Sequence, residues 1–416
     1  MAGWKYLSVF FIIVDSIIMG VQIILYLKAQ NFAKESRSPK FLGHLINVAF
    51  LAFNIPLVFT LVMRNRIISP SAIFLYGAIY PFFLWHFTSF VLFILLILTK
   101  IIKLPFVSAI WGLKRFEKSK LWLDKVKKDE RILNYDIRRR MFVRKSVTVL
   151  IGGAFVGSAY GSYRRNDYLI SYIDLPINNL PDKFEHFTIT MLTDIHSSIF
   201  MEKDQMELYV KAANDLGGDL TVVTGDFVNS LVEEVYPFAE AFSGLKAPYG
   251  VYGVLGNHDF FTHDVEAVAK EVNACGIKLI RDDNVTIQKD GQKIYLLGVD
   301  DVGNARRAGD LFDNVLIGTE ANLPKILMCH RPYFFEQAAA RNIDVTLSGH
   351  THGGQLVIAR IGGEVFAPAR LVSPYIAGMY KKENSLMYVS RGIGTVGIPI
   401  RINCPPEITK FRLVKA

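Results

Sequence analysis

The chain has 416 residues, 51% of them hydrophobic, and a mean hydropathy of +0.27, so it is long for one domain and too apolar for an ordinary soluble enzyme. Its net charge of +9 is uneven, because residues 1–165 hold 24 Lys and Arg against 7 Asp and Glu, a net of +17, and the remainder has a net of −8. The basic excess therefore accompanies apolar runs and does not indicate nucleic-acid binding, and the three widely spaced cysteines form neither a disulfide framework nor a CxxC metal site.

Four apolar runs in the front part predict membrane-spanning helices. Residues 7–27, 42–63 and 71–102 are each long enough to cross a hydrocarbon core of roughly 30 Å. Residues 146–163 form a shorter, glycine-rich fourth run. The sequence therefore predicts a transmembrane region with three spans over residues 1–103 and a fourth transmembrane helix at 146–163.

Basic residues between the third and fourth runs predict the orientation. Residues 100–145 carry 15 Lys and Arg, so residues 104–145 are predicted to be a basic, cytoplasmic, amphipathic segment along the membrane surface. Four spans then place the chain after Tyr163 outside the cytoplasm, in a multi-pass protein of the cell (inner) membrane. The run Arg138-Arg139-Arg140 is typical of an internal twin-arginine export signal or of a stop-transfer flank, and either would export the remainder of the chain.

From about residue 184 the sequence pattern changes to short apolar strands that alternate with helix-like stretches. Strands are predicted at residues 187–192, 220–224, 251–255, 294–299, 325–329 and 345–347. Helices are predicted at residues 202–216, 232–245 and 264–275. This alternation predicts an α/β layered catalytic domain over residues 164–416.

The predicted strands end in polar residues of one chemical kind. In chain order these are Asp194 and His196, then Asp226, then Asn257, His258 and Asp259, then His330, and finally His350 and His352. In open α/β sheets ligands gather at the carboxyl ends of strands, so these segments are expected to converge on one site. Carboxylates and imidazoles without thiolates favour Mn, Fe or Zn, and so many ligands suit two ions about 3.5–4 Å apart that share a carboxylate. Taken singly, Asp194 and Asp226 could instead cap helices, and His330 could be an ordinary buried histidine.

This series of motifs resembles the calcineurin-like metallophosphoesterase superfamily over roughly residues 186–413. The tail motifs Arg391-Gly392-Ile393-Gly394 and Arg401-Ile402-Asn403-Cys404-Pro405-Pro406-Glu407-Ile408 are most similar to the bacterial membrane-associated branch. The resemblance implies a four-layer αββα sandwich, preceded here by the α-helical transmembrane region, and two divalent metal ions.

The resemblance also implies the roles of the site residues. The first metal would be bound by Asp194, His196 and His352, the second by Asn257, His330 and His350, and Asp226 would bridge the two. His258 would act near the leaving oxygen as a general acid or charge stabiliser, oriented by Asp259. Asn229 departs from the family pattern, which often has a second aspartate at that position.

We therefore expect a membrane-anchored dimetal phosphoester hydrolase. A metal-bridging hydroxide would attack a phosphodiester or pyrophosphate of a lipid-linked substrate, because a tether raises the local concentration of such a substrate. The expected partners are the lipid bilayer and that substrate, with no nucleic acid and no obligate protein partner. Two alternatives are a membrane transporter or sensor with a regulatory phosphoesterase domain, and a metal-dependent phosphoprotein phosphatase.

Three arginines near these motifs have two interpretations each. Arg331 either contacts a phosphate oxygen or is a surface residue. Arg391 and Arg401 either contact substrate or brace loops, and the second interpretation is favoured.

Overall fold

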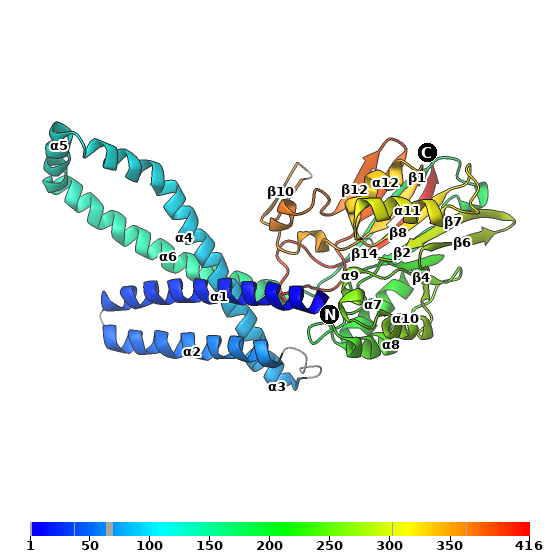
Figure 1. Ribbon diagram of the computed structural model, residues 1–416, viewed down its shortest axis with the longest axis horizontal. Helices are drawn as coiled ribbons and strands as arrows, with labels where there is room; N and C mark the ends of the chain where they lie inside the picture. The colour runs from blue at the N-terminus through cyan, green and yellow to red at the C-terminus, as the bar shows by residue number, and fades with distance from the viewer. Residues whose placement is uncertain (1, 37, 64–69, 302, 363) are drawn as a thin grey trace. The chain divides into compact units, whose positions relative to one another are not determined.

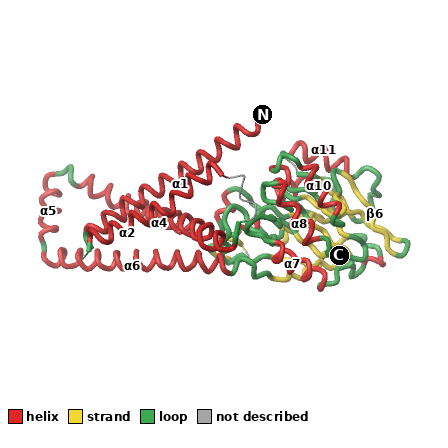
Figure 2. Tube along the Cα trace, turned by 90° about the horizontal axis from the view of Figure 1, so that it is seen from below, coloured by secondary structure: helices red, strands yellow, loops and turns green. Residues whose placement is uncertain are grey.

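The computed structural model describes residues 2–36, 38–63, 70–301, 303–362 and 364–416. Its contacts divide the chain into two compact units, which are described separately. The helical unit comprises Met1–Arg66 and Ser71–Tyr160, and the α/β unit comprises Gly161–Ala416 with the short stretch Ile67–Pro70. The helical unit runs from blue to cyan in Figure 1, and Figure 2 shows strands only in the α/β unit of the described chain.

Long helices make up the helical unit. They are α1 (Ala2–Lys34), α2 (Pro39–Met63), α3 (Ala72–Phe74), a π-helical turn η1 (Leu75–Ile79), α4 (Tyr80–Leu113), α5 (Glu117–Lys128) and α6 (Glu130–Tyr163). Within the described residues, Ile13–Lys34 and Ala72–Leu113 are long and apolar enough to cross a bilayer. The predicted runs 42–63 and 146–163 lie in α2 and at the end of α6, and the number of membrane crossings stays a prediction.

The basic stretch after the third predicted span is divided among three helices. Helix α4 continues through residue 103 to Leu113, α5 comes next, and α6 begins at Glu130 and continues without a break into the fourth apolar run. The segment expected over 104–145 is helical in three pieces, and its place along the cytoplasmic membrane surface stays a prediction. Helix α6 continues into the apolar run because residues 130–145 contain no Gly or Pro that would end it.

Polar and aromatic side chains join the helices of this unit. The indole N–H of Trp85 on α4 donates to Gln22 Oε1 on α1 at 3.0 Å, and its ring stacks on Phe53 of α2 with centroids 4.7 Å apart. Tyr26 donates to Asn47 Oδ1 at 2.9 Å, which joins α1 to α2. Hydrogen bonds between otherwise apolar helices fix their mutual register.

Two six-stranded sheets form the centre of the α/β unit. The first has the order β1 (Leu169–Ile177), β14 (Glu407–Lys415), β2 (Thr188–Leu192), β3 (Leu220–Val223), β4 (Val251–Gly253) and β5 (Lys278–Leu279). The second has the order β12 (Gly378–Lys382), β13 (Ser385–Val389), β9 (Val345–Ser348), β8 (Lys325–Cys329), β7 (Gln292–Val299) and β6 (Asp283–Lys289). A separate hairpin joins β10 (Ala359–Ile361) to β11 (Glu364–Phe366).

Helices cover the outer faces of both sheets. They are α7 (Lys203–Asp215), α8 (Val235–Phe242), α9 (Asn257–Phe261), α10 (Val265–Ala274), α11 (Ala305–Val315) and α12 (Phe335–Ala339). Met191 and Val222 of the first sheet pack against Ile326 and Leu347 of the second in one buried cluster between the sheets. Further clusters join the first sheet to α7, α8 and α10, and the second sheet to α11 and α12. The four-layer αββα architecture is thus confirmed (Figure 1).

The predicted strands and helices of this unit are confirmed within about two residues of their expected bounds, with one exception. The helix expected at 232–245 is α8 preceded by a 3₁₀ turn, Val232–Glu234. Before residue 355, the sequence prediction missed β1, β5, β6, α9, α11 and α12. Strand β1 lies at the sheet edge, where most of its residues are at least partly exposed, so its hydrophobic pattern is weak.

Glu407, at the start of β14, connects the first sheet to the loop after β13. Its carboxylate accepts hydrogen bonds from Arg391 Nη2 at 3.0 Å, from the Arg391 backbone N–H at 3.1 Å, from the Tyr388 hydroxyl at 2.9 Å and from Ser171. Burial opposes ionisation, but the guanidinium of Arg391 outweighs it and lowers the pKa of Glu407.

We predict that Glu407→Gln lowers the free energy of unfolding by about 3 kcal/mol, because it leaves the mostly buried Arg391 without its charge partner. The pKa of Glu407 is lowered on folding, so this contribution is complete above the unfolded value near 4.5 and is lost as the pH falls through the folded value. Thermal unfolding of the detergent-solubilised chain at several pH values measures both effects. The control Asp174→Asn breaks an exposed ion pair with Arg412 and should barely change the melting temperature. Equal losses in the two variants would contradict the prediction.

Candidate metal centre

The carboxyl ends of strands from both sheets bring the predicted site residues together. Asp194 and His196 follow β2, Asp226 follows β3, His330 follows β8, and His350 and His352 follow β9. Asn257 and His258 begin α9 just after β4. Every one of these residues is buried except His258 and His350, which are partly exposed. The predicted convergence of five separated segments is therefore present.

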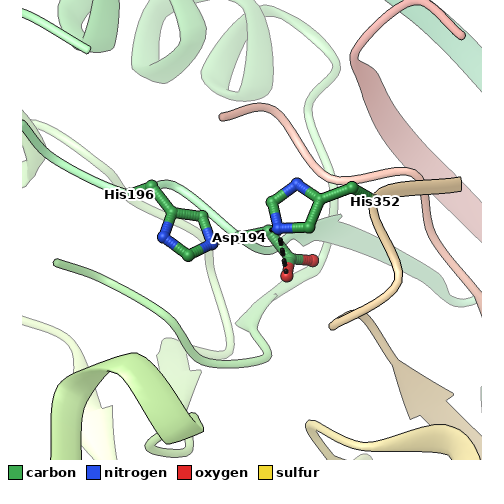
Figure 3. Close-up of side chains that lie close together, drawn as sticks. All are labelled: Asp194, His196 and His352. Carbon is green, nitrogen blue, oxygen red and sulfur yellow. Dashed lines mark hydrogen bonds and ion pairs between the residues drawn. The ribbon is translucent and has the colours of Figure 1, made fainter. Parts of the chain in front are cut away.

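The side chains form overlapping clusters of possible metal ligands. One contains Asp194, His196 and His352, which Figure 3 shows pointing toward one another. A second contains Asp226, His330 and His350, and a third contains Asp226, His196 and His258. In each cluster the ligand atoms lie within 4.8 Å of one another. Asp226 belongs to two of the clusters, and His196 links the first to the third.

Distances place the Asp226 carboxylate between the two sides of the site. Its Oδ2 lies 3.1 Å from His330 Nε2 and 3.4 Å from His196 Nε2. On the other side of His196, its Nε2 lies 3.0 Å from His352 Nε2, which in turn lies 3.4 Å from Asp194 Oδ1. One carboxylate oxygen between two imidazoles from different sheets is the arrangement that a bridging ligand requires.

The donor set fits divalent cations. Burial lowers the pKa values of His196 and His352 well below the ordinary range, so both rings are neutral and present lone pairs. The buried Asn257 Oδ1 has no hydrogen-bond partner in the described part of the chain. His330 Nδ1 donates to the Thr224 carbonyl at 2.8 Å, which turns its Nε2 toward Asp226. Carboxylate, amide and imidazole donors that converge on one small volume without thiolates are the ligand set that Mn, Fe or Zn binds.

The buried carboxylates of the site differ in their pKa values. Burial raises the pKa of Asp194 to about 6, and burial together with the Asp226 charge raises that of Asp259 to about 8. Burial would also raise the pKa of Asp226, but the neighbouring His330 outweighs it and holds that pKa well below its ordinary value. Asp226 is thus the carboxylate that the surrounding side chains keep ionised.

Asp259 has a different role from the predicted one. Its carboxylate accepts four backbone N–H groups, from Asp226 at 3.0 Å, Phe227 at 2.9 Å, Val228 at 3.2 Å and Gly256 at 2.8 Å. These bonds fix the loop that carries Asp226 against the start of α9, because that loop and the first turn of α9 share one acceptor. Asp259 therefore positions Asp226, and the expectation that it orients the His258 ring is corrected.

The carbonyl oxygen of Asn229 orients His258 instead. His258 Nδ1 hydrogen-bonds to it, and since a carbonyl only accepts, Nδ1 carries the proton. The Asn229 loop is held by Glu234, whose carboxylate accepts the backbone N–H groups of Asn229 at 2.9 Å and Ser230 at 2.7 Å. The sequence analysis missed Glu234, which belongs to no motif. The departure at Asn229 leaves this contact intact, because the contact uses the backbone.

The three arginines have different contacts. Arg401 is buried and donates to the carbonyl oxygens of Gly394, Cys404, Arg391 and Gly392, so it braces loops as interpreted. Arg391 pairs with Glu407, which supports the same interpretation. Arg331 makes two hydrogen bonds to the Asp301 carboxylate at 2.6 and 2.8 Å, and a phosphate contact by Arg331 stays a prediction.

The ligand residues have strained backbone angles, and the segments that carry them approach each other closely. The φ angles of Asp194, His196, Asp226, His350 and His352 are all positive, between 49° and 71°. Such angles are uncommon for residues other than glycine and concentrate at functional sites. The glycines that precede the ligands permit close approach, since a Cβ at Gly349 would lie 2.2 Å from Asp194 Oδ2.

Comparison with known proteins agrees with this geometry. Residues 187–354 match the family described as calcineurin-like phosphoesterase. The two-sheet fold and the His/Asp clusters agree with this match and support a metal-dependent phosphoesterase. The matched residues all lie in the α/β unit, which is therefore similar to the calcineurin-like phosphoesterases.

Relatives occur in animals and bacteria. The transmembrane protein with metallophosphoesterase domain of Danio rerio is 31% identical over 255 residues, which is 59% of this chain and 57% of that protein. The metallophosphoesterase YkuE of Bacillus subtilis is 29% identical over 286 residues, covering 66% and 97% of the two chains. The phosphodiesterase YaeI of Escherichia coli is 29% identical over 239 residues, covering 56% and 84%. The chain thus spans little more than half the length of the animal relative, and the range of relatives does not resolve the branch.

We predict that Gly349→Ala reduces bound metal and lowers the melting temperature, because the new methyl group would collide with Asp194 and Thr193. The matched control is Gly244→Ala, whose Cβ would meet only Val210, at 3.9 Å. Metal content per chain by mass spectrometry and thermal unfolding are measured on both variants. Full metal content in Gly349→Ala would contradict the spacing argument.

Proposed function

We propose that the chain is a membrane-anchored dimetal phosphoester hydrolase that acts on a phosphodiester or pyrophosphate of a lipid-linked substrate. The observation that carries the proposal is the Asp226 carboxylate, which lies within 3.4 Å of imidazole nitrogens on both sides of the site. A shared carboxylate between two donor clusters favours a pair of ions over a single one.

The ligand assignment follows the clusters. We assign Asp194, His196 and His352 to one ion, Asn257, His330 and His350 to the other, and Asp226 to both. Such ions, when bound, neutralise phosphate charge and lower the pKa of water, so that a nucleophile is available near neutral pH. The identity of the metals stays open among Mn, Fe and Zn.

His258 is the proposed proton donor to the leaving oxygen. Its Nδ1 proton is held by the Asn229 carbonyl, so the ring can release a proton only from Nε2. Its ring lies edge-on to His196, with centroids 4.5 Å apart, which places it beside the ligand clusters. A diester leaves as an alkoxide, and protonation of that oxygen lowers the barrier.

The proposed substrate class and the proposed membrane location of the protein rest on the apolar helices of residues 1–163. Apolar helices support a tether to the bilayer, which raises the effective concentration of lipid-borne substrate. The names of the Danio rerio and Escherichia coli relatives, a transmembrane protein and a phosphodiesterase, support the same proposal. We further propose a multi-pass inner-membrane protein of the bacterial membrane-associated branch with its α/β unit outside the cytoplasm, an orientation that activity of an alkaline phosphatase fused after Ala416 would test.

We predict that Asp226→Asn lowers turnover of a soluble aryl phosphodiester by roughly 10³-fold or more, because several kcal/mol of transition-state stabilisation is lost with the ions. Turnover by the full chain in detergent with added Mn is compared with metal content. Chelator-treated wild-type protein should regain activity with Mn, whereas the variant should not. The control Asp215→Asn removes an exposed partner of Lys211 and should leave both readouts unchanged. Normal turnover by Asp226→Asn would refute the dimetal site.

We predict that His258→Ala lowers turnover of an alkyl phosphodiester by roughly 10²-fold or more, in the range of general acid catalysis. An aryl diester with a nitrophenolate leaving group should lose much less, because that group leaves without a proton. The exposed His186→Ala serves as the control. Equal losses on the two substrates would exclude proton donation by His258.

A further inference from the structure

Large apolar side chains are exposed together on the segment that comes after the metal-centre turn. Within residues 355–376 the exposed fractions are 77% for Ile358, 64% for Ile361, 50% for Phe366, 90% for Leu371 and 77% for Val372. These five residues are called the apolar patch. They lie on β10, β11 and the 3₁₀ turn Pro368–Leu371 or beside them, and Figure 1 shows the β10 region projecting from the sheets. Several exposed apolar residues on one segment mark an interaction site.

Buried side chains hold the inner side of the 355–376 segment in place, and this inner side is called the base of the segment. Val357, Val365, Ala367 and Ile376 form a small buried core of their own with Cys404. The segment thus has an inner apolar face that is covered and an outer apolar face that is exposed. A disordered loop would not distinguish the two faces, so the exposure is a property of the fold.

The same base is attached to the metal-centre turn. The Thr351 hydroxyl, between His350 and His352, donates to the Ile376 carbonyl at 2.6 Å. A Cβ at Gly354 would lie 2.7 Å from the Cβ of Ala367, so the turn and the segment are in direct contact. Whatever the apolar patch contacts is therefore brought close to the metal centre.

The end of helix α6 is attached to this base as well. The backbone N–H of Arg401 donates to the Gly161 carbonyl at 3.1 Å. One residue further, the N–H of Ile402 donates to Gln355 and its carbonyl accepts from Val357, at 3.0 and 2.9 Å. Gly161 belongs to the apolar run 146–163, which is predicted to cross the bilayer. The base of the segment is therefore bonded to the last residues of that predicted span, within the α/β unit.

Charge supports a lipid surface as the occupant. Arg360 and Arg370 lie within the 355–376 segment, and Lys381 and Lys382 follow on β12. Arg370 pairs with Glu364 and Lys382 with Glu336, whereas Arg360 and Lys381 have no acidic partner among the described residues. Basic side chains around an apolar patch match anionic headgroups around acyl chains.

We propose that the apolar patch inserts into the interfacial layer of an anionic bilayer and holds the metal centre at the headgroups. The claim that the patch positions the metal centre for a lipid substrate rests on the proposed function. The claim that the patch inserts into a bilayer does not, and it is measured separately by fluorescence.

Insertion is measured with a fluorophore on Leu371→Cys in the full chain, reconstituted in vesicles of anionic phospholipid. Cys275→Ala removes the partly exposed native thiol, and Cys329 and Cys404 are buried. The control label is on Ile317→Cys, since Ile317 is 73% exposed and outside the patch. Label emission at residue 371 should shift to the blue and be quenched by a lipid-borne quencher, and that at residue 317 should not. The proposal would be overturned if the label at residue 371 stayed in water. It would also be overturned if that label were shielded from water but not quenched by lipid, because a protein would then cover the patch.

The second part of the experiment measures turnover of a vesicle phospholipid and of a soluble diester. The double variant Leu371→Ser/Val372→Ser should lose about tenfold or more in turnover of a vesicle phospholipid, as expected when buried Leu and Val side chains are removed. Its turnover of a soluble aryl diester should equal that of wild type, and Ile317→Ser should change neither. Equal loss on both substrates would overturn the headgroup-positioning role. If lipid quenching is seen and wild type cleaves no phosphodiester, insertion stands and the proposed function fails.

Discussion

The structure depends on one carboxylate being held where strand ends of two sheets meet. Asp226 follows β3 of the first sheet, and its Oδ2 lies 3.1 Å from His330, which follows β8 of the second. A buried charge at this point is tolerable only with opposite charge and fixed donors around it. The surrounding imidazoles, the backbone N–H of His258 at 2.8 Å and any bound cations supply that environment. The packing of the two sheets is thus also the assembly of the site.

Holding this arrangement requires strain and specific support. The positive φ angles of the ligand residues cost of order 1 kcal/mol each, and they persist because neighbouring contacts determine them. Asp259 fastens the Asp226 loop through four backbone N–H groups, and Arg401 fastens the loops behind Asp194 through carbonyl oxygens. Neither side chain needs to touch substrate to matter for catalysis. Both act by keeping ligand atoms in place, so that the centre is organised before substrate binds.

The 355–376 segment connects this centre to the rest of the chain. It begins directly after the turn that carries His350 and His352, and its base is bonded through residues 400–402 to the end of α6. The metal-centre turn and the exposed apolar residues therefore follow one another along the chain, and backbone hydrogen bonds join Gln355 to Ile402 and Arg401 to Gly161. This continuity makes a lipid-facing role physically coherent for the α/β unit. The tail supplies β12, β13 and β14 to the two sheets, and its loops brace Asp194 and the segment base.

The sequence by itself determined the strand–helix alternation, the strand-end positions of the ligands and their type. Parallel strands buried on both faces are continuous apolar runs, and polar residues after such runs must gather at one sheet edge. The sequence could not determine that Asp259 supports the Asp226 loop, that Asn229 holds His258, or that Glu234 supports Asn229. Those contacts join residues through backbone groups, which leave no signature in side-chain type. Likewise, the edge strand β1 and its partner β14 pair across more than 200 residues, as Ile170 does with Ile408, and only tertiary packing decides such a pairing.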